Sequence, residues 1–177
     1  MKKNSKILIF LLTLCFLVSC MPQNKHTDSF YDINDGLTPK RIPLIKPIDM
    51  NISFSSDTWD LDLKPSMWRD YPDSQGLYYL YGYVHDVDKF TVINGIIMAY
   101  SMFVDTDADA YIQDNFYHWF VLIPEKEITT GFHTEDEFTK YIQSLGADEP
   151  EWQTPDNAYK QFKKTGCLEW IPDCDQQ

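Results

Sequence analysis

The sequence is poor in basic residues and in glycine. Its 177 residues contain 15 lysines and arginines against 27 aspartates and glutamates, which gives a formal net charge of -12 at pH 7. So acidic a chain lacks the positive surface that holds nucleic-acid phosphates, and we expect no nucleic acid among its partners. The 7 glycines form no glycine-rich nucleotide-binding loop. The acidic surface suits a partner protein with a basic surface or a divalent metal, or it serves solubility alone.

The common catalytic motifs are also missing. The chain contains no H-E-x-x-H, no G-x-S-x-G and no P-loop. Among its 4 histidines, His85 lies beside Asp86, and His118 lies in an apolar run where we expect a hydrogen-bonded sheet residue. A catalytic triad assembled from distant residues stays open. The sequence therefore leaves catalysis undecided and favours a non-enzymatic function.

A short apolar run stands out at the N-terminus. Lysines precede it, it covers residues 7–18, and Ser19-Cys20 follows it. A charged start, a short apolar body and a small-residue exit are typical of an export signal, and the run is too short to span a bilayer as a stable helix. Its last residues, Leu17-Val18-Ser19-Cys20, resemble the lipobox of bacterial lipoproteins.

This resemblance implies cleavage before Cys20 and attachment of lipid to that cysteine, with the membrane as a partner through the lipid. Met21 follows where an aspartate retains lipoproteins of enteric-type bacteria in the inner membrane. We therefore expect the periplasmic face of the outer membrane, or the outer face of the cell membrane if the organism has one membrane. The predicted organisation is a signal peptide (1–19), a lipidated flexible tether (20–40) and one domain (41–177).

Two of the 4 cysteines remain for the domain. Cys167 and Cys174 are expected to form a disulfide, because an exported protein reaches a compartment that permits one. A metal site at this pair is disfavoured, since no further cysteine or histidine lies nearby in the sequence to complete four ligands.

The middle of the chain predicts β-strands. Residues 41–50, with two prolines, indicate an edge strand. Residues 59–63 alternate apolar and acidic side chains, and the tyrosine-rich residues 77–84 favour a further strand. Asn94-Gly95 lies between two β-branched runs and predicts a hairpin with a type I′ turn. Residues 116–123 are apolar at successive positions, which indicates a central strand covered on both faces.

The C-terminal part predicts two helices. Thr134 and Glu137 have the spacing of a capping box, and a helical apolar pattern follows them. Thr154-Pro155 starts a second helix that ends at Gly166. Strands followed by helices define an α+β fold, here an antiparallel meander with the Asn94-Gly95 hairpin, packed against two C-terminal helices.

An acidic segment is the sharpest candidate metal site, and His85 with Asp86 and Asp88 is a weaker one. Asp105, Asp107 and Asp109 resemble the first three ligand positions of an EF-hand calcium loop. The segment departs from that loop where Ala110 replaces the glycine and Phe116 replaces the bidentate glutamate. Ca²⁺ binding and a solvated acidic loop therefore both remain open.

Aromatic residues make up 15% of the chain. Trp68, Arg69 and Tyr71 lie in a turn-rich segment where we expect surface exposure and partner binding. In size, charge and anchor the protein resembles small lipoproteins, among them immunity proteins that neutralise toxins in the periplasm. We expect a protein-binding module of this kind. A glycan- or envelope-binding module that uses surface aromatics is the alternative, and a hydrolase that uses His85 or His118 comes third.

Overall fold

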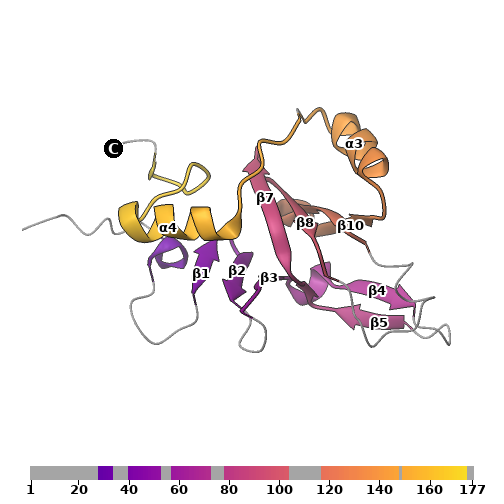
Figure 1. The fold of residues 1–177 in the computed structure, drawn as a ribbon, viewed down its shortest axis with the longest axis horizontal. Helices are drawn as coiled ribbons and strands as arrows, with labels where there is room; N and C mark the ends of the chain where they lie inside the picture. Colours follow the sequence, from indigo (N-terminus) through magenta and orange to yellow (C-terminus); the bar gives the residue numbers. More distant parts are fainter. Residues whose placement is uncertain are drawn as a thin grey trace, which may run out of the picture.

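Two antiparallel β-sheets and two helices make up most of the described chain. The computed structural model describes residues 28–33, 40–52, 57–72, 78–103, 117–147 and 149–174. Within these ranges each sheet has four strands, and the helices α3 (Glu135–Ser144) and α4 (Pro155–Thr165) follow the strands (Figure 1). The predicted α+β class is confirmed. The described strands are divided among two four-stranded sheets and one two-stranded sheet instead of forming a single sheet.

The first sheet contains the strands nearest the N-terminus, in the order β1-β2-β3-β6. They are Arg41–Pro43 (β1), Asp49–Ile52 (β2), Trp59–Asp62 (β3) and Tyr83–Val84 (β6). In β3 Trp59 and Leu61 are buried and the aspartates are half-buried, as their alternation predicts. The prediction of one strand over residues 41–50 is wrong, because the chain reverses where Leu44 N donates to Ile48 O at 3.1 Å.

The second sheet has the order β10-β9-β8-β7. Its strands are Val87–Ile93 (β7), Ile96–Ser101 (β8), Trp119–Ile123 (β9) and Ile128–Phe132 (β10). Asn94 and Gly95 join β7 to β8 with φ angles of 51° and 79°, which confirms the predicted hairpin. The sequence does not predict β10, because its two threonines and its glycine interrupt the apolar alternation and every residue is half-buried.

Alternate residues of β8 and β9 enter two different cores. The residues that pack with the first sheet and α4 are Ile97, Ala99, Phe120 and Leu122. The residues that pack with α3 are Met98, Trp119, Val121 and Ile123. The whole of β9 is buried, which confirms a central strand covered on both faces. Figure 1 shows the two helices that cover these cores: α4 lies across β1 and β2, and α3 lies on the other side of the molecule.

Both predicted helix starts are confirmed. Thr134 Oγ1 accepts from Glu137 N at 3.3 Å, and Thr134 N donates to Glu137 Oε2 at 3.2 Å. The hydrogen bond that Thr134 N donates to the Glu137 carboxylate is the main cause that holds the pKa of Glu137 below its usual value. Thr154 caps α4 in the same way through Asn157 N, and Gly166 ends α4 with a φ angle of 72°.

A separate hairpin corrects two strand predictions. The short helix η2 (Pro65–Met67) precedes β4 (Arg69–Pro72), which pairs with β5 (Tyr78–Tyr81). Arg69 and Tyr71, expected in a turn-rich segment, therefore lie in a strand. The single strand predicted over residues 77–84 is divided at Gly82, because β5 pairs with β4 and β6 pairs with β3. The short helix η3 (Pro124–Lys126) ends β9.

Two terminal segments pack against this body. The short helix η1 (Ser29–Tyr31) belongs to the segment predicted as a tether, and its Tyr31 is buried in the core that the first sheet and α4 share. Cys167 and Cys174 form the predicted disulfide. Leu168 and Ile171, inside the disulfide ring, are buried in the same core. The ring therefore attaches the last described residues to the fold.

Candidate binding surface

The outward face of the first sheet carries three carboxylates. Asp49, Asp60 and Asp62 alternate with buried residues of β2 and β3, so they lie on the face away from the core. Arg41 Nε donates to Asp49 Oδ2 at 2.5 Å, and Arg41 Nη1 donates to Phe30 O at 2.9 Å. Among the described residues, neither Asp60 nor Asp62 forms an ion pair with a lysine or arginine. This face therefore presents excess negative charge.

Among these three aspartates, Asp62 is the one whose pKa is clearly shifted by its surroundings. Burial raises its pKa above the ordinary value of 3.8, and the charge of Asp49 raises that pKa further. Asn51 Nδ2 donates to Asp62 Oδ2 at 2.9 Å and opposes the rise in pKa. Asp62 lies opposite Tyr83 in the register of β3 and β6. A partly desolvated carboxylate thus lies beside an aromatic residue.

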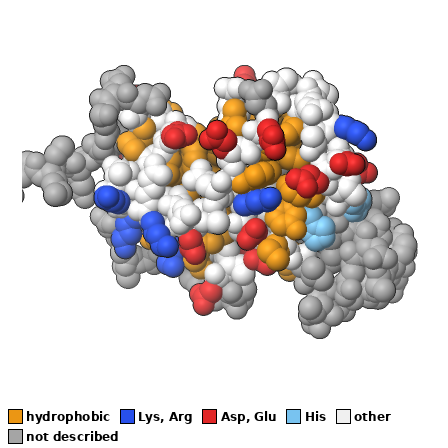
Figure 2. Space-filling model, turned by 45° about the horizontal axis from the view of Figure 1, so that its top comes forward, with side chains coloured by type: hydrophobic (Ala, Val, Ile, Leu, Met, Phe, Trp, Pro, Cys, Tyr) orange, Lys and Arg blue, Asp and Glu red, His pale blue; other side chains and the backbone are white. Residues whose placement is uncertain are grey.

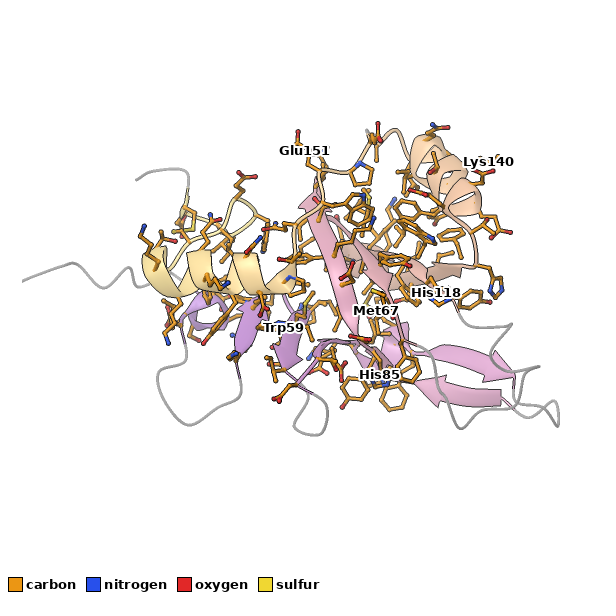
Figure 3. The ribbon with its side chains drawn as sticks, viewed as in Figure 1. Trp59, Met67, His85, His118, Lys140 and Glu151 are labelled. Atoms are coloured by element: carbon orange, nitrogen blue, oxygen red, sulfur yellow. A yellow bond between two sulfur atoms is a disulfide. The ribbon has the colours of Figure 1, made fainter. Side chains whose placement is uncertain are left out.

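Asp60 fixes the turn that follows β6. Its Oδ1 accepts from Asp86 N at 3.0 Å, and its Oδ2 lies 3.3 Å from His85 Nδ1. Asp86 has a φ angle of 48°, which a residue with a Cβ adopts only with local support. On the other side, Ser101 Oγ donates to His85 O at 2.5 Å. The turn is therefore held by both β3 and β8, at the margin of the molecule where Figure 3 labels His85.

Two aromatic rings contact His85, and an exposed methionine follows the neighbouring strand. The His85 ring stacks on Tyr83 with centroids 5.6 Å apart, and it lies 5.2 Å from the ring of Phe103. Tyr83 is 48% exposed and Met102 is 57% exposed. Met102 N donates to Asp86 O at 3.1 Å, which attaches this segment to the turn. We call Tyr83, His85, Met102 and Phe103 the β6-edge patch. Aromatic residues and methionine are enriched at protein interfaces.

Trp68 is exposed beside this patch. Its side chain is 43% exposed, as predicted, and its indole N–H donates to Leu63 O at 3.2 Å. The indole covers Gly82, where an added Cβ would lie 3.1 Å from Trp68 Nε1. Gly82 directly precedes Tyr83, so Trp68 is held close to the β6-edge patch. Its role in binding stays a prediction.

Most other predicted site residues lie outside the described part. Arg69 and Tyr71 lie on β4, but their side chains are outside it. Cys20 and the acidic segment with Asp105, Asp107 and Asp109 are outside it entirely. Within the described ranges, no group of three or more histidine, cysteine, aspartate or glutamate residues is arranged to hold a metal ion. No helix in these ranges is long and apolar enough to cross a membrane.

His118, the second candidate catalytic histidine, is hydrogen-bonded to the end of β8. His118 Nδ1 lies 3.0 Å from Ser101 O, and Ser101 N donates to His118 O at 2.8 Å. These contacts agree with the prediction of a hydrogen-bonded sheet residue. Ser101 is 2% exposed, and its hydroxyl donates to the main chain of His85. The described contacts of Ser101 therefore hold strands together.

Comparison of the chain with protein-family models, with curated proteins and with solved structures found no match. The surface must therefore be interpreted from its own chemistry. Sequence reasoning expected the exposure of Trp68 but missed Met102 and Phe103. Phe103 contacts His85, and the main chain of Met102 bonds to Asp86, because β8 ends beside the turn after β6. In the sequence, the run Tyr83-Val84-His85 next to an aspartate was the signal that could have indicated this surface.

Proposed function

We propose that the protein is a lipid-anchored, non-enzymatic module that binds a partner protein at the β6-edge patch. The anchor part rests on the lipobox-like Leu17-Val18-Ser19-Cys20 and the export-type segment before it. Attachment through Cys20 holds the domain at the periplasmic face of the outer membrane, or at the outer face of a single membrane. The partner is a protein with a basic surface, and one candidate is a toxin that the module inhibits.

The observation that carries this proposal is the pairing of exposed hydrophobic groups with carboxylates that form no ion pair with a lysine or arginine of the described residues. Tyr83 and Met102 are among the most exposed large hydrophobic side chains of the described residues. On β3, Asp62 lies opposite Tyr83 and Asp60 contacts His85. Hydrophobic anchors supply binding energy when a partner covers them, and complementary charge gives specificity and speeds association. Such a surface suits a basic partner with an apolar centre.

The test is affinity capture from the native host with tagged mature protein in which Cys20→Ser removes the lipid site. We expect one stoichiometric basic protein, released by high salt. The double variant Tyr83→Ala/Met102→Ala should recover at least about tenfold less of it, the loss expected from removing interface anchors. Leu145→Ala is the matched control, because Leu145 is also exposed, at 37%, but lies at the end of α3.

Equal recovery by the double variant and the control would exclude the β6-edge patch as the binding site. A captured partner should next be purified and assayed alone and with the mature protein. Loss of the partner's activity in the mixture would support the inhibitor role.

The exposed rings of Trp68 and Tyr83 support one alternative, a glycan-binding module, because sugar rings stack on such surfaces. Recovery of envelope polysaccharide without protein would favour it. In that case Trp68→Ala should lower saturable binding to peptidoglycan fragments, whereas Leu145→Ala should leave it unchanged.

A further inference from the structure

Three aromatic rings surround the ammonium group of Lys89. Its Nζ lies 4.9 Å from the ring centroid of Trp119, 4.9 Å from that of Trp152 and 5.2 Å from that of Tyr100. All three distances are within the roughly 6 Å at which a cation is attracted to an aromatic face. We call Tyr100, Trp119 and Trp152 the aromatic cage. It is separate from the β6-edge patch and has no part in the proposed function.

The fold builds two walls of the cage from the second sheet. Lys89 pairs with Tyr100 across β7 and β8, and Tyr100 pairs with Trp119 across β8 and β9, so the three side chains share one face. The rings of Tyr100 and Trp119 have centroids 4.6 Å apart and are inclined by 51°. Lys89 Nζ lies over both rings, at 5.2 Å from the Tyr100 centroid and 4.9 Å from the Trp119 centroid.

The connection between α3 and α4 supplies the third wall. Gln153 exchanges two main-chain hydrogen bonds with Phe90 of β7, at 2.9 and 3.0 Å, which positions the neighbouring Trp152. Trp152 also packs against Trp119 and Phe138, with each pair of centroids 5.9 Å apart. The rings are therefore held by the sheet, the connection and α3, and not by Lys89 alone.

Lysine is an imperfect occupant for such a cage. Its ammonium has three N–H donors, and aromatic faces offer them no lone pair. Among the described residues, Lys89 Nζ makes no hydrogen bond and no ion pair. A quaternary ammonium ion carries the same charge but has no N–H group to satisfy, and it loses less hydration on entering. The cage thus fits a trimethylammonium group better than it fits its own lysine.

The environment of the cage permits an exchange of cations. Lys89, Tyr100 and Trp152 are partly exposed, so the flexible lysine stem can carry its charge out to water. Glu151, next to Trp152, is exposed and adds negative charge close to this connection (Figure 3). Figure 2 shows hydrophobic side chains across the face that carries α3 and α4, with acidic and basic side chains among and around them.

We propose that the aromatic cage is a binding site for a soluble compound with a trimethylammonium group, which enters as Lys89 leaves. Lys89 then acts as a built-in competitor for the site. A free ligand of this kind, and not a neutral molecule of the same shape, is the expected occupant, because the rings attract it through its charge.

The test is a titration of the mature protein with choline, followed by tryptophan fluorescence and by the indole N–H signals of Trp119 and Trp152. The wild-type chain should bind choline saturably. Lys89→Ala should bind it about fivefold more tightly, the factor expected from removing a competing cation–π contact. Lys126→Ala, which removes an exposed lysine from η3, should leave the affinity unchanged. In Lys89→Ala, the further change Trp152→Leu should abolish binding.

Three outcomes would overturn the proposal. If 3,3-dimethyl-1-butanol, a neutral analogue of choline, binds as tightly as choline, the site is only an apolar cavity. If Lys89→Ala binds choline and the wild-type chain does not, Lys89 occupies the cage permanently and choline does not displace it. If phosphatidylcholine vesicles bind and free choline does not, the group is recognised on a lipid. Circular dichroism of each variant separates loss of binding from loss of folding.

Discussion

Asp60 and His85, 25 residues apart in the sequence, meet across the first sheet with Asp60 Oδ2 at 3.3 Å from His85 Nδ1. The second oxygen of the same carboxylate accepts from the main chain of Asp86. One side chain of β3 thus orients the His85 ring, which stacks on Tyr83, and closes the turn beneath it. The β6-edge patch therefore depends on Asp60 for its shape as well as for its charge.

Replacing Asp60 should affect both stability and binding. The Asp60 side chain is 15% exposed, so Asp60→Ala leaves the Asp86 N–H without its acceptor, and we expect a loss of about 1–3 kcal/mol in the free energy of unfolding. Urea denaturation measures it. Asp88→Ala, at an exposed position of β7, should change stability by less than about 0.5 kcal/mol. Equal effects of the two variants would contradict the role given to Asp60.

Gly82 should not tolerate a larger side chain. Gly82→Ala places a Cβ about 3.1 Å from Trp68 Nε1, and the indole must move away from its acceptor Leu63 O. We expect a destabilisation of about 1–3 kcal/mol, as for other overpacked sites, with a shift in tryptophan emission. Trp68→Phe removes the indole N–H, and Gly82→Ala in that background should show a smaller additional loss. An unchanged emission spectrum would show that Trp68 does not contact Gly82.

Asp62 should make stability fall as the pH rises. Burial first, and the Asp49 charge second, place its folded-state pKa above 3.8. The folded state therefore binds more protons than the unfolded state between the unfolded and the folded pKa, and stability decreases with pH across that window. Asp62→Asn removes this dependence and should be more stable than the wild type at neutral pH. A pH series of urea denaturation tests it, and the difference should vanish at pH values below the unfolded pKa.

The disulfide should stabilise the C-terminal segment. Closing a ring of about eight residues accounts for about 2.5 kcal/mol through the entropy of the unfolded chain. The double variant Cys167→Ser/Cys174→Ser should lose about that much free energy of unfolding. The main-chain amides of Leu168 and Ile171 should also exchange their hydrogens faster. A reducing agent should lower the stability of the wild type and leave that of the double variant unchanged.

Local signals in the sequence predicted the local structure well. Thr134 with Glu137, Asn94 with Gly95, and Thr154 with Pro155 each contain the groups that complete their own cap or turn, so neighbouring residues decide the outcome. The division into two sheets could not be predicted in this way. It depends on pairing between strands that are distant in the sequence. Gly82, which packs against Trp68, separates only β5 of the hairpin from β6 of the first sheet.

The candidate site was predictable only in part for the same reason. Trp68 lies in a turn-rich segment and could be expected at the surface. The β6-edge patch combines residues of β6 with residues that follow β8, and only the observed register brings Phe103 to His85. The aromatic cage likewise needs Trp152, which a main-chain bridge at Gln153 brings to Lys89.

The most direct test of the proposed function is photo-crosslinking from position 83 in living cells of the native host. The full lipidated chain would carry benzoylphenylalanine in place of Tyr83, with Leu145 substituted in the same way as the control. We predict that illumination joins position 83, but not position 145, to a single basic protein, and that Asp60→Ala reduces the yield. No protein adduct at position 83, or the same adducts at both positions, would contradict a protein-binding role for the β6-edge patch.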